Sequence, residues 1–400
     1  MKIVDYLRKN GIKRAFQVIY QYKIDLVLQK LWAKLLKNKP LGDIIVIESH
    51  NDFDQNGGAF YNYLIENGYN RKYRIVWLLK HKKPGKMPEN VRCFWLYRPS
   101  IRKDYYIARA KYLLADNTVT NKVRPDQISV YCGHGFISLK ETRGVLNVPD
   151  SVDYILSPSA NYDEILAWEL SVPYPTDRLV HLGGPCEDVY FRQIPDEFEK
   201  ITDRKYAKKI LWMPTFRKGG GFRRSDSDRE QPYGIPLIED EAMFEALDSR
   251  LRQDDVLLVI KLHPMQDMSA VRYLPQTENI KVLTGESVKT LGIDNYRLLS
   301  STDALLSDYS SVAYSFLLKN KPLGFVLSDL QDYKLGLCVD NVEDYLVGHK
   351  IFTFEDLMVF LEDVLSGADS FRQRRTELRS WLYEYQDGDS CKRLAEFLKL

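Results

Sequence analysis

The sequence predicts an α/β protein built from two doubly wound, mostly parallel sheets. Short apolar segments alternate with helix-like stretches along the chain, and this alternation is typical of βαβ units. The segments fall into two sets, which a polar stretch at 195–209 separates. A chain of 400 residues has room for two or three domains, so each set is expected to form its own domain.

The expected elements follow this division. The first set of strands lies at 43–49, 73–80, 91–97, 111–117, 127–133, 152–159 and 178–184, with helix-like segments at 58–68 and 160–170. The second set lies at 209–216, 255–263, 280–285, 303–309 and 322–329, with helical stretches near 240–252, 310–320 and 354–366. Two Rossmann-like halves indicate a GT-B-like arrangement, in which ligands meet the carboxyl ends of the strands in the cleft between domains.

We therefore divide the chain into four parts. A basic helical arm is expected at 1–40, a first Rossmann-like domain at 41–200 and a second at 201–370. The C-terminal segment at 371–400 is expected to be helical and to cross back to the first domain.

Charge is distributed unevenly along the chain. The formal net charge is only +2, which excludes a globally basic nucleic-acid binder. Residues 1–40 hold ten basic and two acidic side chains, a charge of +8, so the other 360 residues carry −6. No nucleic-acid partner is expected.

Cysteine usage and hydropathy indicate the cytoplasm. The five cysteines are scattered singly and no CxxC pair occurs, so we expect neither a disulfide framework nor a structural zinc site. The N-terminus has no apolar core long enough for a secretory signal. No run of about 18 apolar residues predicts a transmembrane helix.

Residues 13–37 predict an amphipathic helix, for which two interpretations stay open. Its apolar stripe consists of Phe16, Ile19, Tyr20, Ile24, Val27, Leu28, Leu31 and Leu35. Lysines at 23, 30, 34 and 37 occupy other faces. Such a helix can lie in the interface of an anionic membrane, with Trp32 at headgroup level, or it can pack on its own domain with its lysines in water.

The first candidate catalytic residue is His134. It directly follows a predicted strand and stands between Gly133 and Gly135, which permit a sharp turn and the close approach of a ligand. An imidazole in this position suits a general base near neutral pH. The alternative is a histidine that is merely hydrogen-bonded within a loop.

The second candidate is His263, at the end of another predicted strand. Pro264 follows it and helps to terminate the strand. Lys261 stands two residues earlier and is expected to share its face. The alternative is a structural histidine at a strand end.

Two further segments carry groups suited to phosphate. Asp308 ends a predicted strand, and Ser310 and Ser311 then open a helix, whose free N–H groups and positive dipole end favour an anion. Serines that simply cap the helix are the alternative. Thr215 and Arg217 follow the strand at 209–216, and arginine suits bidentate contact with phosphate.

Several common catalytic motifs are absent from the sequence. It contains no HExxH, no GxxxxGKS/T and no serine-hydrolase elbow. The Asp-Ser-Asp stretch at 226–228 lies in a polar loop and fits poorly as a metal site at a strand end. We therefore infer no metal and no cofactor.

Taken in order, these segments resemble the CDP-glycerol glycerophosphotransferase family, the polyol-phosphate transferases and polymerases of teichoic acid and capsule synthesis. The similarity runs from about residue 44 to the C-terminus. The matching positions are Gly133, His134, Gly135 and Lys140; Pro214, Thr215, Phe216 and Arg217; Lys261, His263 and Pro264; Ser307, Asp308, Tyr309, Ser310 and Ser311; Lys321, Pro322, Asp329 and Tyr333; and Asp387, Gly388 and Arg393.

The resemblance implies a GT-B fold, with the first domain on the acceptor side and the second binding the donor. It implies transfer of a polyol phosphate, glycerol phosphate first, from a CDP-polyol to a hydroxyl of a lipid-linked or glycan acceptor, with release of CMP. By carry-over, His134 is the base and His263 steadies the pyrophosphate or the departing CMP. Ser310, Ser311 and Arg217 hold phosphate oxygens.

The family also makes peripheral contact with membranes, which favours contact of residues 1–38 with the anionic inner face of the bacterial cell membrane. Three positions depart from the family pattern: Cys186 replaces an arginine, Phe136 replaces a threonine and Ser315 replaces an aspartate. The identity of the polyol therefore stays open. Two other functions are retained, a GT-B glycosyltransferase that uses a sugar nucleotide and a non-catalytic scaffold of surface-polymer assembly.

Overall fold

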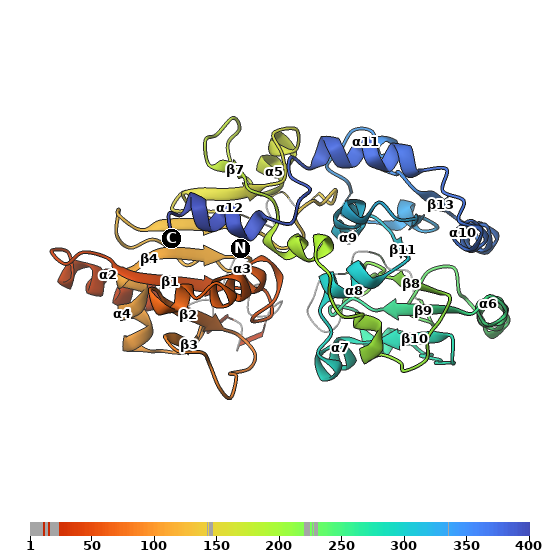
Figure 1. Cartoon of the computed structure of the whole chain (residues 1–400), viewed down its shortest axis with the longest axis horizontal. Coiled ribbons are helices and arrows are strands. Elements are labelled where there is room, and N and C mark those ends of the chain that lie inside the picture. The colour runs from red at the N-terminus through yellow and green to blue at the C-terminus, as the bar shows by residue number, and fades with distance from the viewer. Residues whose placement is uncertain are drawn as a thin grey trace. The chain divides into compact units, whose positions relative to one another are not determined.

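The computed structural model describes residues 11–12, 15–16, 24–141, 143, 147–219, 225, 227, 231–334 and 336–400. These residues form two compact units. The first unit comprises Met1–Phe136, Arg143–Phe191 and Glu384–Leu400, and the second comprises Ile137–Thr142 and Arg192–Tyr383. Each unit is built around one sheet, as Figure 1 shows.

The first sheet is entirely parallel and has seven strands in the order β3-β2-β1-β4-β5-β6-β7. Its strands are β1 (Gly42–Glu48), β2 (Arg74–Leu79), β3 (Val91–Trp95), β4 (Ala110–Ala115), β5 (Ile128–Tyr131), β6 (Tyr154–Ser157) and β7 (Leu179–His181). The strand order reverses between β1 and β4, as it does in Rossmann folds. All seven strands were predicted from the apolar runs.

Helices cover both faces of the first sheet, which explains why its central strands are buried without alternation. On one face, α4 (Ile101–Arg109) packs on β1 and β4 and adds Ile107 to the core. On the other, α3 (Gln55–Glu66) approaches β1 closely at Gly57, where an added Cβ would lie 3.1 Å from the Ile47 side chain. The remaining helices are α2 (Leu26–Leu35), α5 (Asp163–Glu169) and α12 (Ser390–Phe397).

The second sheet repeats the same winding with six parallel strands, in the order β10-β9-β8-β11-β12-β13. Its strands are β8 (Lys208–Trp212), β9 (Val256–Lys261), β10 (Ile280–Leu283), β11 (Ala304–Ser307), β12 (Leu323–Val326) and β13 (His349–Ile351). Here the order reverses between β8 and β11. Only β13, a three-residue edge strand, was not predicted, because so short a segment carries no periodicity.

The helices of the second unit complete its core. They are α6 (Glu241–Gln253), α7 (Gly285–Leu291), α8 (Asn295–Ser301), α9 (Ser311–Phe316), α10 (Phe354–Ser366) and α11 (Arg372–Leu382). Leu247 of α6 and Phe360 of α10 pack with Trp212 of β8 in one large apolar cluster. Thr353 begins α10 with a capping box, which fixes that end of the helix at the predicted residue.

The two units exchange short segments relative to the expected boundaries at 200 and 370. Residues 137–142 belong to the second unit, and so does α11. The chain joins the first unit again only from Glu384 onwards, where α12 packs against α3 and η3 (Pro185–Phe191). The functional roles given to the domains stay predictions.

The longest described element of the N-terminal arm is α2, which lies on the first unit beside α4 (Figure 1). Its polar side faces the protein, because Lys103 donates to Asp25 at 2.5 Å and Gln29 donates to Asp104 at 3.2 Å. Trp32, expected at headgroup level, packs edge-on against Tyr105 at 5.2 Å between ring centroids. Residues 13–14 and 17–23 of the predicted helix lie outside the described residues.

The apolar stripe of α2 faces away from the protein. Val27, Leu31 and Leu35 are 65%, 53% and 66% exposed, and Ile24, just before the helix, is 45% exposed. The helix thus packs on its domain through polar groups together with Trp32 and Ala33, and presents Val27, Leu31 and Leu35 outward, so the membrane interpretation stays a prediction. Nowhere in the described ranges is a helix both long and apolar enough to span a bilayer.

Candidate active site

The predicted site residues follow the carboxyl ends of strands in both sheets, where ligands bind in doubly wound folds. In the first unit, His134 follows β5, the strand next to β4. In the second unit, Arg217 follows β8, Asp308 follows β11 and Asp329 follows β12. Each unit thus gathers its own group of polar side chains at one sheet edge.

In the first unit, the turn around His134 has the backbone that its sequence predicts. Gly133 and Gly135 have φ values of +70° and +71°, which side chains with a Cβ rarely adopt. The His134 Nδ1 lies 3.3 Å from the Asp116 carbonyl oxygen. A carbonyl only accepts hydrogen bonds, so Nδ1 carries the proton and Nε2 keeps its lone pair. Burial lowers the pKa of His134 below its ordinary value, which keeps the ring neutral near pH 7.

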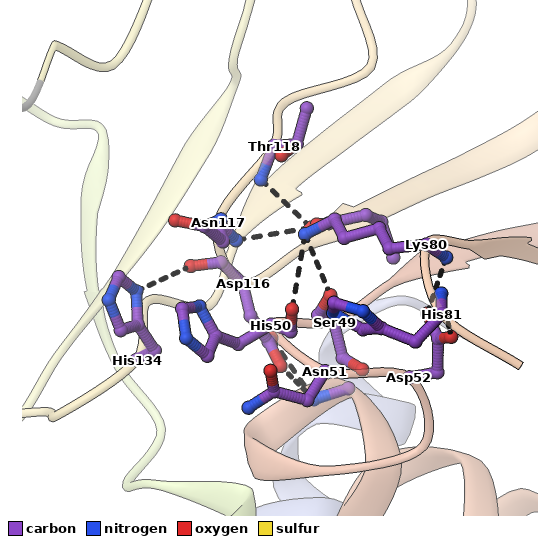
Figure 2. A network of polar contacts seen from close by, with 12 residues as sticks. Ser49, His50, Asn51, Asp52, Lys80, His81, Asp116, Asn117, Thr118 and His134 are labelled. Atoms are coloured by element: carbon purple, nitrogen blue, oxygen red, sulfur yellow. Dashed lines mark hydrogen bonds and ion pairs between the residues drawn. The ribbon is translucent and has the colours of Figure 1, made fainter. Parts of the chain in front are cut away.

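A second imidazole, which the sequence analysis missed, lies against this ring. The rings of His50 and His134 stack with 4.8 Å between centroids and 12° between planes, as Figure 2 shows. His50 follows β1 directly, and that position at the carboxyl end of a strand was the available signal. The residues that follow His50 in the sequence are typical of a polar loop. The sequence alone therefore gave no reason to pair His50 with His134.

The loop that carries His50 is fixed by charged side chains at the ends of β1 and β2 (Figure 2). Lys80 forms a buried ion pair with Glu48 and donates to the Ser49 carbonyl at 2.9 Å. Glu48 also accepts from the Thr118 N–H at 2.9 Å, which joins the ends of β1 and β4. Burial raises the pKa of Glu48, although the Lys80 charge opposes that shift.

Asp116 and Asn56 tie the histidine turn to α3. The Asp116 carboxylate accepts from the Gly57 N–H at the start of α3, at 2.8 and 3.0 Å to its two oxygens. The Asn56 amide donates to the carbonyls of Cys132 and Gly133, at 2.9 and 3.0 Å, and accepts from the Cys186 N–H at 3.1 Å. Cys186, which departs from the family pattern, is thus buried, and its backbone N–H is linked to the histidine turn through Asn56.

The C-terminal segment of the chain is hydrogen-bonded to residues 182–188 of the same unit. Asp188 accepts from the N–H groups of Ser390 and Cys391 at 2.8 and 2.9 Å. Arg393 donates to the Leu182 carbonyl at 3.0 Å and pairs with Asp387 at 2.8 Å. The Asp387–Arg393 segment of the family pattern therefore performs a structural task here.

In the second unit, Arg217 is almost completely buried between two carboxylates. Its Nε and Nη2 donate to Asp329 at 2.6 and 2.9 Å, and its Nη1 donates to Asp308 at 2.9 Å and to the Thr215 carbonyl at 2.7 Å. Burial alone would lower the pKa of Arg217, but the two carboxylates raise it. These contacts use most of its donors, which differs from the expected contact with phosphate.

Thr215 and Lys140 extend the same network. The Thr215 hydroxyl donates to Asp308 at 2.7 Å and accepts from the Lys140 ammonium at 3.1 Å. The ammonium lies 5.7 Å from the centre of the Tyr309 ring, and the Arg217 guanidinium lies 5.3 Å from it. Four predicted residues thus form one network, although they come from three segments far apart in the chain. They are Lys140, Thr215, Arg217 and Asp308.

Lys261 differs from Arg217 in having no partner. Its side chain is 4% exposed, and within the described ranges its ammonium makes no hydrogen bond or ion pair. Burial lowers its pKa to about 8. A buried cation without a counter-charge is costly, so the position favours binding of an anion.

His263 has the opposite tautomer from His134. Its Nδ1 accepts from the Met265 N–H at 3.1 Å, so Nε2 carries the proton. The ring lies against Phe216 with 5.0 Å between centroids. A ring N–H suits contact with an oxygen that bears negative charge.

The serine segment lies at the end of β11. The Ser307 hydroxyl donates to the Met213 carbonyl at 3.1 Å, so it joins β11 to the loop after β8. Ser310 stands at the N-cap of α9 with extended backbone but makes no side-chain cap hydrogen bond. In the part of the chain that is described, the hydroxyl of Ser311 is likewise uncommitted. Capping therefore does not account for these serines.

Taken with two parallel sheets wound alike, these sites define an α/β transferase of GT-B-like fold. The chain belongs to the CDP-glycerol:poly(glycerophosphate) glycerophosphotransferase family, whose profile matches residues 32–400. The family resemblance inferred from the motifs is thereby confirmed. The family consists of polyol-phosphate transferases of teichoic acid synthesis, and the donor polyol of this chain is not fixed by membership.

Curated relatives act on different polyols. The chain is 25% identical over 318 residues to the teichoic acid ribitol-phosphate primase of Bacillus spizizenii, covering 74% of this chain and 76% of that protein. It is 23% identical over 306 residues to the teichoic acid glycerol-phosphate primase of Bacillus subtilis, covering 70% and 74%. Both comparisons span most of each protein.

A solved structure supports the fold. The wall teichoic acid polymerase TagF, as an H444N variant soaked with CDPG, superposes with a TM-score of 0.72 at 18% identity. The match covers 100% of this chain and 98% of that chain. The GT-B-like architecture expected from two Rossmann-like halves is therefore confirmed.

Proposed function

We propose that this protein transfers a polyol phosphate, glycerol phosphate in the first instance, from a CDP-polyol to a hydroxyl of a lipid-linked or glycan acceptor. The acceptor oxygen attacks the phosphorus that bears the polyol, and a new P–O bond forms. The P–O bond to CMP breaks, and CMP leaves with the electron pair. The acceptor proton passes to His134 Nε2.

The observation that carries this proposal is the pair of opposite histidine tautomers. His134 has a backbone carbonyl at Nδ1, which leaves Nε2 to accept a proton. His263 accepts a backbone N–H at Nδ1, which places its proton on Nε2. A base for a hydroxyl and a donor for an anionic leaving group are the two roles that phosphoryl transfer needs.

The second group of residues divides into contacts and supports. Lys261, Ser310 and Ser311 have uncommitted polar atoms and are proposed to bind the phosphates of the donor. Arg217 is proposed to act through its neighbours, because its donors already hold Asp308 and Asp329. A rigid support of this kind preorganises the groups that touch charge.

The test is a donor panel combined with two histidine variants. Purified protein is given CDP-glycerol, CDP-ribitol and sugar nucleotides with candidate acceptors, and release of the nucleoside monophosphate or diphosphate is measured. We expect CMP from a CDP-polyol, a loss of about 10²- to 10⁴-fold in His134→Ala, and little change in His81→Ala, whose imidazole is exposed. Nucleoside diphosphate from a sugar nucleotide would instead support glycosyl transfer, and no turnover or nucleotide binding would support a scaffold.

We also propose that the arm holds the enzyme on an anionic membrane surface. Ile24, Val27, Leu31 and Leu35 form an exposed apolar stripe, and exposed lysines at 30, 34 and 37 flank it. Apolar side chains that enter the interface and cations that meet anionic headgroups are the two contributions to such binding. The polar contacts of Asp25 and Gln29 leave this stripe outward.

Cosedimentation with phosphatidylglycerol-containing vesicles tests the arm. The double variant Val27→Ser, Leu31→Ser is expected to lose most of its vesicle binding. It should still release CMP from the CDP-polyol when the acceptor is soluble. Val359→Ser is the matched control, because Val359 is 55% exposed on α10, and we expect it to bind like the wild type. Equal binding of all three proteins would refute the membrane role of α2.

A further inference from the structure

His50 is a polar ring held beside the proposed base without a polar partner. It is half-buried, and neither of its nitrogens hydrogen-bonds to any described residue, although Nδ1 is shielded from solvent. A buried nitrogen without a partner costs stability. Burial first, and then the neighbouring charges of His134, Lys80 and His81, lower the pKa of His50 to about 3, so the ring is neutral throughout the working range of pH.

The loop that presents His50 is strained and held in place by several bonds. Asp52, Phe53 and Gln55 have φ values of +68°, +57° and +54°, a left-handed conformation that is unfavourable for residues other than glycine. The Asp52 carboxylate accepts from the N–H groups of Lys80 and His81, at 2.8 Å each. Strain of this kind persists only where the surroundings enforce it, and it is concentrated at functional sites.

We propose that His50 reads the acceptor: its imidazole hydrogen-bonds the hydroxyl next to the one that His134 deprotonates, so the enzyme prefers acceptors that end in a vicinal diol. The two rings lie face to face with 4.8 Å between centroids, and because Nδ1 of His50 is shielded from solvent, Nε2 is the nitrogen available to an acceptor beside His134. Neighbouring hydroxyls on adjacent carbons form a matching pair. A neutral imidazole can donate to or accept from a hydroxyl, whichever tautomer it adopts.

This inference rests on the proposed transferase function and adds the substrate class on the acceptor side. A stack alone would also fix the orientation of His134, so the two roles of His50 must be separated. His50→Phe retains a flat ring for stacking and removes both nitrogens. The side chain of His81 is exposed, and the hydrogen bond of this residue to Asp52 is made by its backbone N–H. His81→Phe is therefore a matched control.

The experiment compares two acceptors that differ by one hydroxyl. The probes are the octyl ester of glycerol phosphate and the octyl ester of 3-hydroxypropyl phosphate, which lacks the middle hydroxyl. For the wild type, we expect kcat/KM to fall about tenfold on the second probe, the loss expected for one uncharged hydrogen bond. His50→Phe should show the same tenfold loss on the first probe and no further loss on the second.

Other readouts exclude a purely structural role. The KM for CDP-glycerol and the pH dependence of kcat should be unchanged in His50→Phe, and His50→Gln should recover part of the lost acceptor affinity. His81→Phe should match the wild type. Two results would overturn the role of His50 in binding the acceptor while leaving the transferase function standing. One is full activity of His50→Phe on the glycerol probe. The other is a further loss of activity when His50→Phe is given the second probe, so that the effects of the substitution and of the missing hydroxyl add.

The remaining outcomes are also decisive. Turnover of a lipid-linked disaccharide acceptor but not of the glycerol probe would overturn the vicinal-diol preference while leaving the transferase function intact. An inactive wild type with every CDP-polyol and acceptor would overturn both proposals. A global loss of circular dichroism in His50→Phe, with His50→Gln folded and unimpaired on the glycerol probe, would identify His50 as structural and refute its role in reading the acceptor.

Discussion

The two sheets end in polar groups of opposite character. At the carboxyl end of the first sheet, the proposed base His134 and the ring stacked on it, His50, are both neutral. Burial lowers the pKa of each imidazole. At the edge of the second, Arg217 and Lys261 are buried cations, one paired with two carboxylates and the other with none. Under the proposed function, the same winding of strands serves proton transfer in one unit and anion binding in the other.

The difference teaches how burial is used. Loss of solvent disfavours charge, so an imidazole under these conditions stays ready to accept a proton. The same loss of solvent makes an unpaired ammonium unstable until a phosphate arrives. Arg217 shows the third solution, in which carboxylates supply the counter-charge permanently and the group becomes part of the framework.

The largest expected effect comes from removing the paired cation. Arg217→Met leaves Asp308 and Asp329 buried without their counter-charge, and we expect the free energy of unfolding to fall by about 3–5 kcal/mol. Urea denaturation of the purified variant measures the change. In the control Arg204→Met, which breaks pairs with the exposed Asp255 and Glu278, the unfolding midpoint should scarcely move. Similar shifts in the two variants would show that the buried network is not a support.

Removing the unpaired cation should have the opposite effect on stability. Lys261→Met replaces an uncompensated buried charge with an apolar chain of similar length, so we expect unfolding to cost on the order of 1–3 kcal/mol more at pH 7. The gain should disappear as pH rises from about 8 towards 10.5, because the wild-type lysine then loses its proton in both states. Turnover should fall, chiefly through a higher KM for the CDP donor. A variant that is both less stable and fully active contradicts the assignment.

The pH profile should separate the two units. His134 accepts a proton only when neutral, and its pKa is lowered from 6.5, so the acid limb of kcat should lie below pH 6.5. Lys261 binds phosphate only when charged, so kcat/KM for the donor should decline above pH 8. Lys261→Arg should move this alkaline limb upward while leaving the acid limb in place. An alkaline limb that does not move excludes Lys261 as its source.

The smallest expected effect concerns two glycines with positive φ. Gly133 (φ +70°) adjoins His134, whereas Gly292 (φ +61°) ends α7 with open space around it. Each substitution by alanine should cost about 1 kcal/mol of stability, because the left-handed backbone strains a Cβ. Only Gly133→Ala should also reduce turnover, since it alters the turn that aims the base. Equal turnover in both variants would show that the turn tolerates adjustment.

Sequence reasoning reached the fold and most of the candidate site. Apolar runs of β-branched and aliphatic residues predicted twelve of the thirteen strands found among the described residues, since a buried parallel strand has a strong local signal. His134, His263, Lys261 and the serine pair were recognisable because each follows such a strand.

The partners of these residues could not be predicted in the same way. Arg217 was predicted to bind phosphate, and its pairing with Asp329, 112 positions away, could not be read from the sequence. The place of His50 directly after β1 was its only signal, and its pairing with His134 depends on a stack with a residue that follows a different strand. The outward direction of the α2 stripe likewise depends on Asp25 meeting Lys103.

By itself, the sequence determined the two doubly wound sheets, the uneven charge and the chemical types at each strand end. These properties depend on local periodicity and on residue identity, which are present in any stretch of chain. Only the tertiary structure decided which nitrogen of each histidine carries the proton, which buried cation is paired and which face of the arm is exposed. Those outcomes depend on contacts between residues distant in sequence, and the free energy of a buried charge or ring nitrogen is set by the partner that folding brings to it.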